Sequence, residues 1–204
     1  MSSDHAEHHD GSGEHVADTG RRKMLTITTA ALGAVGGGAL VVPFAGSLVP
    51  SERAKSAGAP VEVDISKIEA GQQLTYEWRG KPVWVINRTP EMLGSLSELT
   101  PALADPNSNL AQQPAYAQNE HRSIREDILV LVGICTHLGC SPKYLPEVAD
   151  NWEGGFLCAC HGSTFDLAGR VFSGVPAPKN LEVPPHKYLS DNLILVGDDS
   201  GAAS

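Results

Sequence analysis

Two kinds of hydrophobic pattern follow one another along this chain. A charge-free run rich in Ala, Gly, Leu and Val extends from Met24 to Ser51, long enough for one helix to cross a membrane. Beyond residue 60, short apolar runs are separated by Gly, Pro, Asn and Asp, which predicts antiparallel strands. The runs are Pro82–Ile86, Ile128–Gly133, Gly155–Leu157 and Leu193–Val196. The pattern predicts a mainly β head tethered to one N-terminal transmembrane helix, with a short helix around Leu93–Ala104.

The segment before the apolar run has a different composition. Residues 1–20 contain five acids, four histidines and neither Lys nor Arg. This composition predicts a disordered cytoplasmic tail. Because His-rich tracts sometimes bind metal, capture of a metal ion is the alternative. The histidines concerned are His5, His8, His9 and His15.

Residues 21–50 combine an export motif with the expected anchor. Thr19–Leu25 contains Arg21, Arg22 and Lys23 and resembles a twin-arginine signal, a route that exports folded proteins. A plain positive-inside cluster is the alternative, and both place the N-terminus in the cytoplasm. Pro43 is expected to kink or end the helix. A cleaved signal peptide is less favoured, because a secretory apolar region is shorter than this run.

The rest of the chain divides by composition. Ser51–Pro60 is small, polar and flexible, so residues 51–60 are expected to form a hinge linker. Residues 61–198 form the head, and residues 199–204 a disordered C-terminal tail. The 204-residue chain has only 5% aromatics but 21 Gly and 14 Pro, which favours a loop-rich β domain. Its net charge of −9 argues against nucleic-acid binding.

All four cysteines lie in two short segments, residues 135–140 and 158–163. A zinc finger usually groups cysteines in one pair and histidines in another, whereas each segment here is mixed. Mixed segments suit a cluster of two metal atoms, such as a Rieske [2Fe–2S] centre, where two Cys hold one iron and two His the other. We assign Cys135 and Cys158 to one iron, and His137 and His161 to the second.

The remaining cysteines, Cys140 and Cys160, lie one in each segment. We expect the folded segments to bring them together as a disulfide, which requires an oxidising compartment. Two thiolates, two sulfides and two ferric irons sum to zero charge, so the oxidised cluster accepts an electron more easily than a four-thiolate cluster. Such a centre can oxidise a weak reductant such as a quinol, and its imidazoles can couple the electron to a proton.

These two segments resemble the signature boxes of the Rieske iron–sulfur subunit of ubiquinol–cytochrome c reductase. Leu129–Ile134, Trp78–Val83 and the proline loop Gly174–Leu181 resemble further family segments, so the resemblance covers about residues 60–197. It implies a Rieske-type antiparallel β-sandwich head with cluster-binding loops and one [2Fe–2S] cluster. Val175 lengthens the proline loop relative to the family pattern.

The resemblance also assigns individual roles. Ser163 is expected to donate a hydrogen bond to a cluster sulfide, and His161 to contact the quinol. Leu138 is expected to shield the cluster from water. Phe165 stands where the family often has a tyrosine that donates to a ligand sulfur, so we expect a lower reduction potential.

The implied protein is the Rieske subunit of a bacterial cytochrome bc complex. Ubiquinol is the expected reductant, cytochrome b and a c-type cytochrome the expected partners, and the complex is expected to be dimeric. The helix would lie in the inner membrane with the head in the periplasm. The main alternative is a Rieske subunit of another exported oxidoreductase such as arsenite oxidase. A soluble Rieske ferredoxin and a structural zinc protein fit the extra cysteine pair and the mixed boxes poorly.

Overall fold

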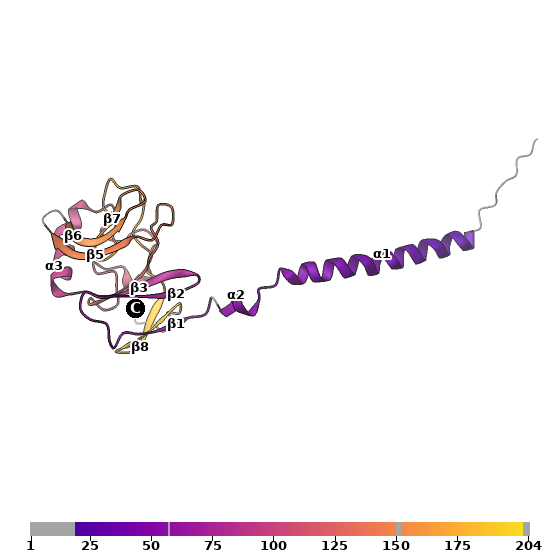
Figure 1. The fold of residues 1–204 in the computed structure, drawn as a ribbon, viewed down its shortest axis with the longest axis horizontal. Coiled ribbons are helices and arrows are strands. Elements are labelled where there is room, and N and C mark those ends of the chain that lie inside the picture. Colours follow the sequence, from indigo (N-terminus) through magenta and orange to yellow (C-terminus); the bar gives the residue numbers. More distant parts are fainter. Residues whose placement is uncertain (1–18, 57, 150–151, 202–204) are drawn as a thin grey trace, which may run out of the picture. The chain divides into compact units, whose positions relative to one another are not determined.

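The computed structural model describes residues 19–56, 58–149 and 152–201 (Figure 1). The chain divides into two compact units, Met1–Ser51 and Glu52–Ser204. The predicted N-terminal tail with its four histidines lies outside the described residues up to residue 18, and so do residues 202–204 of the predicted C-terminal tail.

The first unit contains helix α1, Thr19–Ser47, and none of its described residues is buried. By length and composition α1 could cross a membrane. The hydroxyls of Thr26 and Thr29 donate 2.8 Å hydrogen bonds to carbonyls one turn earlier, so these polar groups are satisfied within the helix. Helix α1 continues through Pro43, which lies in its last turns, and ends four residues later.

The second unit begins with a single helical turn, α2, Glu52–Ser56, inside the segment expected to be a linker. An ion pair of 2.7 Å joins Lys55 to Glu52. Both side chains are more than half exposed, at 55% and 89%, so this pair adds little stability.

The head is built from three antiparallel sheets of three strands each, which confirms the mainly β prediction. The first sheet has the order β1–β9–β8, the second β2–β3–β4 and the third β5–β6–β7. Figure 1 shows the first and third sheets at opposite ends of the head, with β2 and β3 between them. The strands are β1 Val61–Asp64, β2 Gln73–Trp78, β3 Lys81–Asn87, β4 Ile128–Val132, β5 Lys143–Ala149, β6 Trp152–Cys158, β7 Ser163–Phe165, β8 His186–Ser190 and β9 Leu193–Val196.

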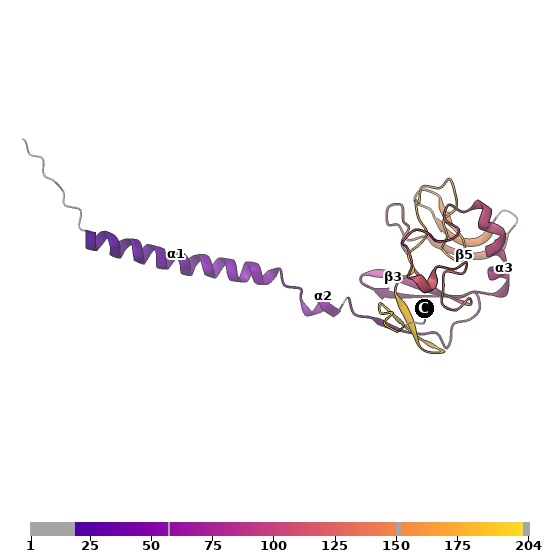
Figure 2. The same cartoon turned by 180° about the vertical axis from the view of Figure 1, so that it is seen from behind.

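All four predicted strands are present, as β3, β4, β6 and β9, and the predicted short helix is α3, Pro90–Leu99. The hydroxyl of Thr89 caps this helix by accepting from the Met92 amide at 3.3 Å, and Pro90 occupies the first helical position. Two 3₁₀ turns follow, η1 (Thr100–Ala102) and η2 (Ala115–Ala117). In Figure 2, α3 lies beside the third sheet, and its Met92 and Leu96 pack against Leu167 and Ala168.

The central sheet separates two hydrophobic cores by the alternation of its strands. Val83 and Val85 of β3 face the core shared with the first sheet. Trp84 and Ile86 face the core shared with β6 and β7. The second core also contains Cys135 and Cys158, so both predicted thiol ligands lie at the edge of a packed core.

Candidate metal centre

The two cysteine segments repeat one local conformation. In each, a glycine four residues after the first cysteine donates its N–H to that cysteine's carbonyl, Gly139 to Cys135 at 3.1 Å and Gly162 to Cys158 at 2.9 Å. Both glycines have positive φ, 85° and 77°, which side chains rarely tolerate. The sequence repeat is therefore also a structural repeat, and it turns both histidine-bearing loops in the same way.

The four predicted ligands come from the ends of two core strands. Cys135 follows β4, and Cys158 is the last residue of β6; each is 2% exposed. His137 is half-buried and His161 is exposed. The imidazole centroids lie 4.7 Å apart with their planes at 87°. Two inner thiols and two outer imidazoles therefore converge from separate loops.

The electrostatics of Cys135 reflect its burial and its neighbours. Burial raises the pKa of the Cys135 thiol, and the neighbouring Cys158 raises it further. Hydrogen bonds from the His137 N–H and the Ser163 hydroxyl to the Cys135 sulfur act in the opposite direction on this pKa. Thiolates and imidazoles are the protein ligands of a Rieske centre, so the donor set of two sulfurs and two imidazoles fits a [2Fe–2S] cluster.

A disulfide joins the two loops, as the sequence predicted. It links Cys140 and Cys160, whose Cα atoms are 6.8 Å apart. Cys140 is half-buried and Cys160 is exposed. The histidine loops are thus covalently tied to each other, and Cys140 packs against the same core that contains Cys135 and Cys158.

The proline loop contacts both cysteine segments. The N–H of Ala177 donates to the Ser163 hydroxyl at 3.0 Å. The Thr136 hydroxyl donates to the Lys179 carbonyl at 2.6 Å. Because Ser163 accepts from the proline loop, its own proton is free to be donated toward the sulfur atoms. The fully buried Ser163 is therefore positioned for the role that the sequence assigns to it.

Leu138 lies at the tip of the first histidine loop. Its side chain is 71% exposed, so it is not part of the packing of the head. An exposed apolar side chain next to His137 suits a surface that is covered by a partner or a ligand.

The Trp84 indole packs against a residue that precedes each of the two predicted thiol ligands. Its indole stacks on Phe156 with ring centroids 5.3 Å apart, two residues before Cys158. The same indole lies against Gly133, two residues before Cys135; a Cβ added at Gly133 would overlap the ring. One side chain therefore packs under the strand ends that carry both predicted thiol ligands.

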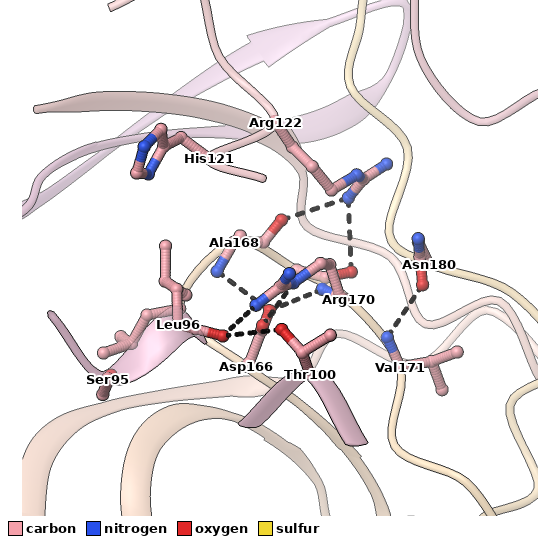
Figure 3. Close-up of polar contacts among 12 residues, drawn as sticks. Ser95, Leu96, Thr100, His121, Arg122, Asp166, Ala168, Arg170, Val171 and Asn180 are labelled. Atoms are coloured by element: carbon pink, nitrogen blue, oxygen red, sulfur yellow. Dashed lines mark hydrogen bonds and ion pairs between the residues drawn. The ribbon is translucent and has the colours of Figure 1, made fainter. Parts of the chain in front are cut away.

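Sequence reasoning missed a buried polar network beside the proline loop (Figure 3). Arg122 is fully buried and donates to the carbonyls of Ala168 at 3.1 Å, Gly169 at 3.3 Å and Leu181 at 2.7 Å. Asn180 accepts from the Val171 N–H at 2.9 Å. The network joins the segment after β7 to the end of the proline loop.

The same network contains a buried ion pair. Arg170 Nε lies 2.7 Å from Asp166 Oδ2, and the side chains are 1% and 0% exposed. Asp166 Oδ1 also accepts from the N–H groups of Ala168 and Arg170, at 2.9 and 2.7 Å. Arg170 Nη2 also donates a hydrogen bond to the Leu96 carbonyl of α3 at 2.7 Å. In the sequence, the only sign of this pair is that opposite charges stand four residues apart, at Asp166 and Arg170.

The comparisons with known proteins agree with this geometry. The family profile described as "Rieske [2Fe-2S] domain" matches residues 104–185, which include all four predicted ligands. The fold and the site thus define a Rieske iron–sulfur protein. A second profile, "Ubiquitinol-cytochrome C reductase Fe-S subunit TAT signal", matches residues 11–51 and confirms the export motif. Together with helix α1, it supports a membrane-anchored, exported Rieske domain.

Whole-chain relatives specify the family. The ubiquinol-cytochrome c reductase iron-sulfur subunit of Allochromatium vinosum is 56% identical over 90% of this chain and 91% of the relative. The subunit of the same name from Bradyrhizobium diazoefficiens is 41% identical over 87% and 94%. A chain of the solved "Hyperthermophilic respiratory Complex III" shares 33% identity over 83% of this chain and 98% of its own, with a TM-score of 0.47.

The chain therefore belongs to the family of ubiquinol–cytochrome c reductase iron–sulfur subunits. Membership implies partners within the cytochrome bc complex. These relatives do not favour the alternative of an arsenite-oxidase-type subunit.

Proposed function

We propose that this chain carries the Rieske centre of a ubiquinol–cytochrome c reductase, with Cys135 and Cys158 on one iron and His137 and His161 on the other. The observation that carries this assignment is the convergence of two buried thiols and two imidazoles, 4.7 Å apart, from loops tied by a disulfide. When bound, the cluster supplies one-electron acceptance at a potential that suits a quinol donor.

Each residue around the proposed cluster has a separate role in quinol oxidation. His161 is exposed on the second loop, so its ring can accept a hydrogen bond from the ubiquinol hydroxyl and take the proton at its outer nitrogen. The Ser163 hydroxyl, held by the Ala177 N–H, donates toward the cluster sulfur. Leu138 shields the histidines from water once the head is docked.

The division of the chain into an apolar helical unit and a separate head suits a mobile carrier. Helix α1 anchors the chain in the inner membrane with its N-terminus in the cytoplasm, and the head lies in the periplasm. Residues 51–60 act as the hinge on which the head moves between the quinol site at cytochrome b and a c-type cytochrome. Ubiquinol gives one electron to this head and the other to cytochrome b, within a dimeric complex, and proton release outside contributes to the proton-motive force.

Low-temperature EPR of membranes containing this chain tests the proposal. Reduction with ascorbate is expected to give a rhombic signal with the low average g-value of a histidine-ligated cluster. A saturating quinol-site inhibitor is expected to change that signal, because it would contact His161. A signal seen only with dithionite would contradict quinol oxidation, and silence with both reductants would contradict the ligand assignment. A signal that the inhibitor leaves unchanged would contradict the quinol contact alone.

A further inference from the structure

Three sulfur atoms crowd together beside the predicted cluster. The Sγ atoms of Cys140, Cys158 and Cys160 all lie within 4.8 Å of one another, although two of them already form the disulfide. Cys158 is the free thiol of the three. Cys135, the second predicted thiol ligand, is not a member of this group. A thiol at this distance from a disulfide is placed for thiol–disulfide exchange.

We infer that Cys158 is the nucleophile of an internal thiol–disulfide exchange that operates whenever its sulfur is not bound to iron. This inference rests on the proposed ligand assignment, which makes Cys158 unavailable in the loaded chain. In the chain without a cluster, the Cys158 sulfur attacks Cys140 Sγ. A Cys158–Cys140 bond forms, the Cys140–Cys160 bond breaks, and the proton of Cys158 ends on Cys160. The number of disulfides is unchanged, so no external oxidant or reductant is needed.

The surroundings of the disulfide determine which of its two sulfur atoms Cys158 attacks. Cys160 is exposed, so water stabilises it as the leaving thiolate. Attack on Cys160 would instead close a disulfide between Cys158 and Cys160 across one intervening residue, a geometry that strains the bond. Because Cys158 is only 2% exposed, external disulfides and alkylating reagents reach its sulfur poorly, which leaves the internal disulfide as its reaction partner.

Because of this exchange, cluster insertion must come before disulfide formation. Its product removes the Cys158 thiolate from the ligand set and replaces it with an exposed thiol at Cys160. A chain that forms its disulfide before it receives iron therefore loses its ability to hold the cluster. Iron and sulfide must be inserted while the four cysteines are reduced, before the chain meets an oxidising compartment.

A matched pair of variants tests the inference in the full-length chain. Cys135→Ser and Cys158→Ser each remove one of the two thiols proposed for the same iron, so both chains should lack a cluster. Only the first retains the proposed nucleophile. Each chain is oxidised, incubated without added thiol, treated with N-ethylmaleimide and digested, and the disulfide-linked and alkylated peptides are identified by mass spectrometry.

The two variants are expected to give different disulfides. In Cys135→Ser, most chains should carry a Cys140–Cys158 disulfide with the maleimide on Cys160. In Cys158→Ser, the Cys140–Cys160 disulfide should persist and leave Cys135 alkylated. Wild-type chains with an EPR-visible cluster should also keep Cys140–Cys160 intact.

Two results would overturn the inference. One is an intact Cys140–Cys160 disulfide in Cys135→Ser. The other is equal scrambling in both variants, which would show that exchange follows general unfolding and not the proximity of Cys158. Neither result touches the proposed function, which depends on the EPR signal of the wild-type chain.

Discussion

The buried ion pair between Asp166 and Arg170 offers the most direct test of what holds the cluster-binding end of the head together. Asp166→Asn keeps the size of the side chain but removes its charge. The amide oxygen can still accept from the N–H groups that Asp166 Oδ1 serves, at 2.9 and 2.7 Å. The amide NH₂ then faces Arg170 Nε, 2.7 Å from the present Oδ2 position, and a donor meets a donor.

The expected loss of folding stability follows from the burial of the ion pair. Arg170 is 1% exposed in the ion pair, so its charge cannot be solvated after the carboxylate is lost. Removing one partner from a buried pair costs roughly 3–5 kcal/mol. For a chain of this size each kcal/mol lowers the melting temperature by about 2–4 °C, so the shift should be roughly 6–20 °C. Since whole domains are stable by only about 5–15 kcal/mol, the variant should fold but be fragile.

The assay is thermal unfolding of the full-length chain in detergent, followed by tryptophan fluorescence at a fixed scan rate. Glu182→Gln is the matched control, because its ion pair with Lys81 has a 3.6 Å separation and side chains 43% and 47% exposed. An exposed pair of this kind contributes about 0–1 kcal/mol. If Asp166→Asn lowered the melting temperature no more than Glu182→Gln, the argument from burial would be refuted.

Three further predictions concern other parts of the head. Gly133→Ala forces a methyl group into the Trp84 indole, so unfolding should cost about 1–3 kcal/mol less and the indole fluorescence should change. Phe165→Tyr supplies a hydroxyl beside the ligand sulfurs and should raise the midpoint potential in an EPR-monitored titration; an unshifted midpoint would contradict the role given to Phe165. Burial lowers the pKa of His186. Below about pH 6.5, His186 is therefore protonated in the unfolded chain but stays neutral in the folded chain. Stability should therefore fall with decreasing pH by up to about 1.4 kcal/mol per unit, and His186→Gln should flatten that slope in urea titrations.

The disulfide between the two cysteine segments was predictable from sequence, because chemistry and spacing coincide there. Four cysteines in two short mixed segments leave few ways to arrange ligands, and Cys140 and Cys160 are in fact joined. The strands that carry the segments were equally clear, because short apolar runs end at Gly133 and at Leu157. Local signals therefore sufficed for the loops themselves.

The supports of the loops were not predictable, because they depend on long-range contacts. Arg122 reads as an ordinary surface cation in sequence, yet it binds carbonyls 46, 47 and 59 residues away and is fully buried. Its positive φ of 51° is also unusual for a residue with a side chain. Only the folded chain places these carbonyls around one guanidinium.

The supports also differ in kind, and that difference has a physical consequence. The two histidine loops are joined to each other by the Cys140–Cys160 disulfide, whereas the proline loop is joined to them by the single hydrogen bonds of Thr136 and Ser163. A hydrogen bond contributes about 1 kcal/mol and reforms at once after opening, whereas a disulfide does not. The end of the proline loop is held separately, because Arg122 donates to the Leu181 carbonyl at 2.7 Å. Loss of either single hydrogen bond to the histidine loops should therefore leave the proline loop in place, whereas loss of the disulfide removes the covalent link between the histidine loops.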